Sequence, residues 1–191
     1  MLQMYFHLNS YGIAAISFYI CIRHSKRLHK TWRQIQERMK IIFLDFDGVM
    51  DTAYYDRYLA SKGLRDTDEY GILFDPKSVE NLKRIIDTTK ADIVVTSSWK
   101  YLMPYDKILE MWSVRKLPGF VTDTTPNVSK HRGDEIDEWL GGRMTECEYV
   151  ILDDLDASNF NEHQLTHLIT INPYTGIEEA DAERAIRLLG G

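Results

Sequence analysis

The sequence predicts an α/β fold, in which a mostly parallel sheet lies between two layers of helices. Two features of the chain predict this three-layer α/β/α sandwich. Short apolar runs, typical of buried strands, alternate with segments whose apolar residues recur at helical spacing. Strands that are separated by helices usually pair in parallel through right-handed crossovers, so this alternation places helices on both faces of one sheet.

The composition fits one globular domain that spans residues 39–191. Of the 191 residues in the chain, 44% are hydrophobic and 27% are charged, which is ordinary for a soluble protein. The stretch after Met39 is long enough to bury one core. The two cysteines, Cys21 and Cys147, form no CxxC pair, so the sequence indicates a reducing compartment and neither a zinc site nor a disulfide framework.

Residues 1–38 form a predicted amino-terminal extension. Residues 11–22 are apolar but short for a membrane span, and residues 23–38 carry six basic side chains against one acid. Two interpretations stay open. The favoured one is an appended helix or a spurious start upstream of Met39. The other is a membrane anchor, whose basic flank would keep the following domain cytoplasmic. Both predict a cytoplasmic domain.

The first predicted strand, residues 41–44, ends in Asp45 and Asp47 and is followed by Gly48. A buried strand delivers these residues to the crevice at its carboxyl end, and side chains two positions apart point to the same side. One carboxylate could therefore attack a phosphorus atom while the other transfers a proton. Both acids are also candidate ligands of Mg²⁺, because this ion prefers oxygen. The alternative is an acidic corner between a strand and a loop.

The segment between this strand and the next helix, residues 54–74, is too short for a large cap domain. Its aromatic and basic residues include Tyr54, Tyr55, Arg57, Tyr58, Arg65 and Tyr70. They could form a small lid whose character suits a nucleotide or a nucleic-acid end. A polar surface helix with half-buried tyrosines is the favoured alternative.

The second predicted strand, residues 92–95, ends in a run of hydroxyl side chains. Ser97 is the first candidate for binding a phosphate oxygen, followed by Thr96 and Ser98. The alternative is an ordinary turn that caps the next helix. Trp99, which follows, is expected mainly to pack.

Helical or strand spacing predicts four further elements. They are helices over residues 78–87, 105–114 and 180–189, and a short strand over residues 168–171. In the second of these helices, Ile108, Leu109 and Trp112 are expected to share one face.

A basic segment opens the helix that is predicted to continue from residue 129 through residue 140. Lys130 and Arg132 are both candidates for reaching a phosphate group, where a cation would stabilise crowded negative charge. The unused one is expected to be a solvated residue of the first helical turn. His131 is expected at the surface.

The third predicted strand, residues 149–152, ends in Asp153 and Asp154. Adjacent carboxylates at the end of a buried strand repel each other unless a cation or hydrogen-bond donors offset their charge. These two residues are therefore candidate ligands of Mg²⁺ together with Asp45. The sequence does not decide which of the two binds directly.

These motifs, taken in order, resemble the haloacid dehalogenase-like (HAD) phosphohydrolase superfamily over roughly residues 39–189. The resemblance implies a Rossmann-like sheet with a small or absent cap. It implies that Asp45 is the nucleophile and Asp47 the general acid and base. It also implies a phosphate-binding Ser97, a basic Arg132 or Lys130, and a metal-binding pair at Asp153 and Asp154.

A narrower resemblance is to the HAD domain of Swiss Army Knife RNA repair proteins. It is carried by the strings TSSW, RGDEI and ILDD. In that group an Arg or Lys commonly precedes the helix glycine, which favours Arg132. The sequence departs from the group at Lys100, where Arg is frequent, and at Asp51 and Thr52, which lead into the tyrosine-rich stretch.

The sequence therefore predicts a Mg²⁺-dependent phosphomonoester hydrolase that acts through an aspartyl-phosphate. A polynucleotide-end phosphatase in nucleic-acid repair and a noncatalytic binding protein are the alternatives. The expected partner is a phosphorylated small molecule or a nucleic-acid end. Since residues 1–38 carry +5 of the chain's net charge of −6, residues 39–191 carry −11, and so acidic a domain argues against long nonspecific contact with nucleic acid. Membrane contact through residues 1–38 is the lesser alternative.

Overall fold

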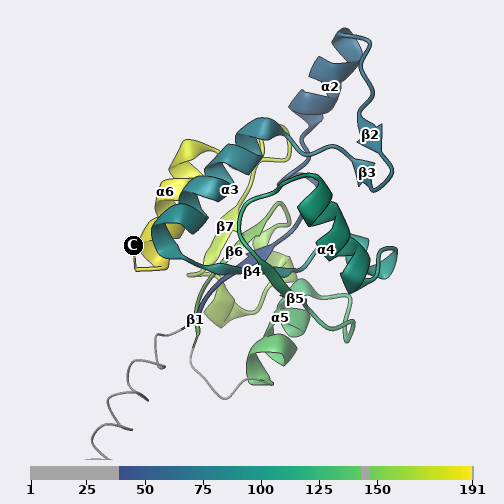
Figure 1. Cartoon of the computed structure of the whole chain (residues 1–191). Helices are drawn as coiled ribbons and strands as arrows, with labels where there is room; N and C mark the ends of the chain where they lie inside the picture. The colour runs from purple at the N-terminus through teal and green to yellow at the C-terminus, as the bar shows by residue number, and fades with distance from the viewer. Residues whose placement is uncertain (1–38, 143–146, 191) are drawn as a thin grey trace, which may run out of the picture. The chain divides into compact units, whose positions relative to one another are not determined.

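The computed structural model describes residues 39–142 and 147–190 (Figure 1). They belong to the unit Arg38–Gly191. The predicted extension, its helix and its anchor lie outside the described residues. Among the residues that are described, no helix has the length and apolar character that crossing a membrane requires.

The central sheet has five strands in the order β5-β4-β1-β6-β7. Their bounds are Met39–Leu44 for β1, Asp92–Val95 for β4, Val121–Thr124 for β5, Cys147–Asp153 for β6 and Leu168–Thr170 for β7. Every neighbouring pair in this order is parallel. Leu44 lies beside both Val95 and Leu152, so the residues that follow β1, β4 and β6 emerge at one edge of the sheet. The predicted parallel pairing is confirmed.

Helices cover both faces of this sheet. They are α3 (Pro76–Thr89), α4 (Tyr105–Val114), α5 (Arg132–Gly141) and α6 (Glu179–Leu188). Because successive side chains of a strand point to opposite faces, Ile42 and Leu44 enter the core that includes residues of α3, α4 and α6, whereas Ile41 and Phe43 pack with residues of α5. In Figure 1, α3 and α6 lie side by side on one face. The predicted three-layer sandwich is confirmed.

A capping residue explains where α3 begins, and apolar spacing explains which side of α4 is buried. Asp75 caps α3 by accepting the Lys77 N–H at 2.9 Å, and Pro76 occupies the first helical turn. In α4, Ile108 and Trp112 are buried as predicted. The prediction for Leu109 is wrong: 38% of it is exposed, and Met111 is buried instead.

A small insert stands out from the sandwich in Figure 1. It contains α2 (Ala53–Ser61) and an antiparallel hairpin of β2 (Thr67–Asp68) and β3 (Gly71–Ile72). Thr52 caps α2, because its Oγ1 accepts the Tyr55 N–H at 3.0 Å. Arg115 ties the hairpin to the end of α4 through Asp68, at 2.7 Å. The insert is small, as predicted, but its hairpin was not predicted.

Among the elements of the sandwich, β5 and α5 differ most from the sequence prediction. Strand β5 was not predicted, because it is a four-residue edge strand, VTDT, that pairs only with β4. Helix α5 begins at Arg132, three residues later than predicted, since the preceding residues form a turn in which Ser129 Oγ accepts the His131 N–H at 3.0 Å. This later start places Arg132 in the first turn of the helix.

Candidate active site

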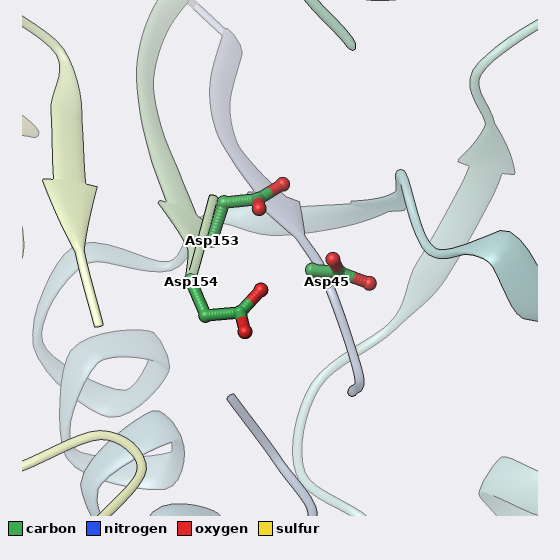
Figure 2. Close-up of side chains that lie close together, drawn as sticks. All are labelled: Asp45, Asp153 and Asp154. Carbon is green, nitrogen blue, oxygen red and sulfur yellow. The ribbon is translucent and has the colours of Figure 1, made fainter. Parts of the chain in front are cut away.

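Three carboxylates converge at the carboxyl edge of the sheet. Asp45 directly follows β1, Asp153 is the last residue of β6, and Asp154 comes next. Each offers one oxygen atom, and these atoms lie within 4.8 Å of one another. Figure 2 shows Asp153 and Asp154 leaving the end of one strand, with their carboxyl groups on the side where Asp45 lies. The cluster contains three of the four predicted metal ligands.

Gly48 allows this close approach. Its φ of +72° is strained for any residue with a Cβ. A Cβ at this position would also lie 2.6 Å from Asp154 Oδ2 and 2.9 Å from Pro173 Cβ. The positive φ at Gly48 lets the chain turn sharply after β1, and the absent side chain leaves room for Asp154.

Asp45 is held by donors and by a cation. Its Oδ1 accepts the Phe46 N–H at 2.7 Å, and its Oδ2 lies 3.2 Å from an Arg132 nitrogen. Burial raises the pKa of Asp45, although Arg132, the Phe46 N–H and the Ser97 side chain favour the charged form. The Phe46 N–H and Arg132 therefore hold the Asp45 carboxylate in a buried site that opposes its negative charge.

Arg132 is the cation that reaches the site. Besides Asp45, its guanidinium contacts Asp153 Oδ2 at 3.2 Å and donates to the Thr96 carbonyl. Although burial opposes its charge, the negative charges of Asp45 and Asp153 raise the pKa of Arg132. Lys130 is exposed. Of the two predicted cations, the structure brings only Arg132 to the carboxylates.

Asp47 lies outside the three-carboxylate cluster and is fixed by two donors. The Trp99 indole N–H donates to Oδ1 at 2.7 Å, and the Ser98 hydroxyl donates to Oδ2 at 3.1 Å. Trp99 packs against Phe46 as expected, but the expectation is incomplete, because its indole N–H also holds Asp47. The role of Asp47 as a metal ligand stays a prediction.

The predicted hydroxyl candidates occupy three different environments. Ser97 is fully buried and interacts with Asp45, and its Oγ accepts the Trp99 N–H at 3.4 Å. Thr96 Oγ1 is buried without a hydrogen-bond partner. Ser98 is exposed and bonded to Asp47. Ser97 and Ser98 therefore border the two aspartates that follow β1.

The donor set fits a divalent cation. Burial, followed by the charge of Asp45, raises the pKa of both Asp153 and Asp154, so their ionised forms need a compensating charge. Asp153 Oδ2 is buried without a hydrogen-bond partner, although Arg132 forms an ion pair with it. An all-oxygen set of this kind suits Mg²⁺ or another hard cation.

A fourth acid near the cluster is Asp51, whose carboxylate accepts the Gly48 N–H at 3.0 Å. Burial raises the pKa of Asp51 to about 7.

A buried ion pair beside the site was not found from the sequence. Lys100 Nζ lies 2.5 Å from Glu135 Oε2, and only 4% of each side chain is exposed. The same ammonium donates to Thr125 Oγ1 at 2.7 Å, and the Tyr101 hydroxyl donates to Glu135 Oε1 at 2.9 Å. Burial lowers the pKa of Lys100. The departure at Lys100 was the only signal, and nothing in the sequence indicated its partner.

The comparisons agree with these motifs. The model of one family, described as the HAD domain in Swiss Army Knife RNA repair proteins, matches residues 41–182. No curated protein and no solved structure is matched. The matched region spans most of the chain and includes Asp45, Arg132 and both aspartates that end β6. The chain therefore belongs to the family of HAD domains found in Swiss Army Knife RNA repair proteins.

Proposed function

We propose that this protein is a Mg²⁺-dependent phosphomonoester hydrolase that acts through an aspartyl-phosphate on Asp45. The observation that carries the proposal is the meeting of Asp45, Asp153 and Asp154 around one point, with Arg132 against two of them. Family membership supports a hydrolase on the HAD fold. The alternative, an acidic corner between a strand and a loop, accounts for Asp45 and Asp47 alone. It gives no reason for two further carboxylates from the end of β6 and an arginine from α5 to meet Asp45.

In the proposed first step, an Asp45 carboxylate oxygen attacks the phosphorus atom in line with the leaving oxygen. The P–O bond to the leaving group breaks, and Asp47 gives its proton to that oxygen. Trp99 and Ser98 keep the Asp47 side chain in place. Asp47 then takes a proton from water, which attacks the phosphorus atom and releases inorganic phosphate, so Asp45 is regenerated.

Charge stabilisation comes from groups that are already in position. Arg132 supplies a guanidinium that can bond to phosphoryl oxygens, and Ser97 and the N–H groups after β4 are further candidate donors. Asp45, Asp153 and Asp154 would hold the metal ion. A bound Mg²⁺ would keep Asp45 ionised and offset the charge of the phosphoryl oxygens.

A panel assay tests this proposal. Sugar phosphates, nucleoside monophosphates, and oligoribonucleotides phosphorylated at the 5′ or the 3′ end are incubated with Mg²⁺ or with a chelator, and released phosphate is measured. We expect hydrolysis with Mg²⁺ and a loss of at least about a hundredfold with the chelator. Binding of these compounds without any hydrolysis would instead favour a noncatalytic protein on the same scaffold.

The structure favours Arg132 over Lys130 as the phosphate-binding cation. Arg132→Met is expected to lower kcat/KM by about a hundredfold to a thousandfold, comparable to the loss of one transition-state donor. Lys130→Met is the matched control and is expected to leave kcat/KM within about threefold, because an exposed charge contributes little. Arg132→Lys tests whether charge alone suffices. A larger loss for Lys130→Met would assign the cation to the other residue.

A nucleic-acid end is the second candidate substrate. The HAD domains of this family occur in RNA repair proteins, which supports a phosphorylated polynucleotide end over a free metabolite. In the panel, this candidate predicts a higher kcat/KM for the phosphorylated oligoribonucleotides than for ribose 5-phosphate.

A further inference from the structure

An exposed aromatic surface lies between α2 and the loop that follows β7. It consists of Tyr54, Arg57 and Tyr174 and is called the aromatic platform below. The two tyrosine rings meet edge to face with their centroids 6.0 Å apart, and Arg57 Cζ lies 5.4 Å from the Tyr174 centroid. Nevertheless, 53% of Tyr54 and 42% of Tyr174 are exposed. The contacts therefore orient the rings without burying them.

Backbone contacts place the platform at the border of the candidate active site. The Tyr54 N–H donates to the Tyr174 carbonyl at 3.1 Å, which joins α2 to the loop. In that loop, Pro173 lies against Gly48, since a Cβ on Gly48 would be 2.9 Å from Pro173 Cβ. The same Cβ would be 2.6 Å from Asp154 Oδ2. The loop that carries Tyr174 thus adjoins the Gly48 turn, against which Asp154 also lies.

The charge near the platform suits a short stretch of nucleic acid. Arg57 is the basic member of the platform, and Lys62 and Arg65 follow it with one acid, Asp56, whereas Asp66, Asp68 and Glu69 come next in the chain. Lys62 Nζ lies 5.8 Å from the centroid of Tyr58, another exposed ring on α2. Because the whole chain has a net charge of −6, this favourable charge is local. It suits the last nucleotides of a strand and not an extended duplex.

We infer that the aromatic platform stacks the terminal nucleobase of a phosphorylated single strand, while the terminal phosphate enters the carboxylate site. Aromatic rings accept every base, because each base has a π face, and the Arg57 guanidinium can stack on a base or bind a backbone phosphate. The placement of the phosphate rests on the proposed function. Stacking itself needs no hydrolysis and can be measured separately.

The test uses the full chain and two readouts. The variants Tyr54→Ala and Tyr174→Ala are assayed with a phosphorylated oligoribonucleotide, with the same strand lacking its terminal base, and with ribose 5-phosphate. We expect KM for the intact strand to rise about tenfold to a hundredfold, as for one lost stacked base, and kcat/KM for ribose 5-phosphate to stay within about twofold. Binding of the labelled strand in chelator, followed by fluorescence anisotropy, is expected to weaken by the same factor.

Three controls make the result decisive. Tyr54→Phe and Tyr174→Phe keep the rings and are expected to bind like the wild type. Phe120→Ala removes a ring that is 77% exposed at the amino end of β5, far from the strand ends that carry the site, and is expected to have no effect. Unchanged urea midpoints show that the alanine variants are folded.

Several outcomes would overturn the inference. Equal binding of the intact and abasic strands by the wild type would exclude base stacking. Equal losses of kcat/KM for the strand and for ribose 5-phosphate would show that the tyrosines only support the structure of the site and do not bind a base. A dimer that the alanine substitutions disrupt, with strand binding unchanged, would assign the platform to a second copy of the chain. If hydrolysis fails while binding remains base-dependent, the proposed function fails and the platform stands.

Discussion

Replacing the proposed nucleophile, Asp45→Asn, is expected to abolish phosphate release, with a fall in kcat of at least about a thousandfold. An amide oxygen is a poor nucleophile, and the substitution also removes one of the three charges that would hold the metal. The fold is expected to persist, because an asparagine oxygen can still accept the Phe46 N–H and Arg132 keeps its contact with Asp153. Initial rates under saturating substrate and Mg²⁺ measure the effect.

The matched control is Asp87→Asn on the exposed end of α3. It makes the same chemical change where the Asp87 carboxylate pairs with the exposed Lys83, so its rate is expected to equal that of the wild type. Substantial turnover by a folded Asp45→Asn variant would exclude Asp45 as the nucleophile.

The largest expected effect on stability comes from breaking the buried ion pair, by Lys100→Met. We expect the free energy of unfolding to fall by about 3 to 5 kcal/mol, since Glu135 would keep a buried charge without its cation. The pair is 2.5 Å apart, with 4% of each side chain exposed. Urea denaturation monitored by tryptophan fluorescence measures the loss, under conditions in which the wild type unfolds in a single transition.

A double variant separates the unpaired charge from lost packing. Lys100→Met with Glu135→Gln is expected to recover part of the loss, because glutamine carries no charge and can still accept from Tyr101. On the surface, Lys83→Met breaks a pair with Asp87 whose side chains are 61% and 60% exposed, and it is expected to cost under about 1 kcal/mol. If Lys100→Met and Lys83→Met lowered the free energy of unfolding by similar amounts, burial would not be the reason for the loss at Lys100.

Much of the fold was predictable because local patterns coincide with long-range pairing. The apolar runs of β1, β4 and β6 are buried strands, and the spacing within α3 and α6 matches the faces that they bury. Strand β5 escaped prediction because its four residues, VTDT, are partly polar and are defined by pairing with β4. The strands of the β2–β3 hairpin have two residues each, too few for any periodicity.

The candidate site was predictable where strand ends determine position. Because β1 and β6 are parallel neighbours, the residues at their ends, Asp45 and Asp153, lie at the same edge of the sheet whatever the loops that follow. Arg132 was favoured by its position directly before Gly133. The structure explains why a glycine occupies position 133, since a Cβ there would lie 2.7 Å from the backbone nitrogen of Asn161. The indole bond from Trp99 depends on how the chain turns after β4, and this turn has no repeating pattern that a sequence could display.

The central claim is that Asp45 carries the phosphoryl group during turnover. The most direct measurement is to mix the protein with substrate and Mg²⁺, quench the reaction rapidly in acid, digest the chain and locate the modified residue by mass spectrometry. We predict one phosphoryl group on Asp45, and none in the Asp45→Asn variant. A phosphoryl group on another residue, or sustained hydrolysis with no phosphorylated protein at any quench time, would contradict the proposed mechanism.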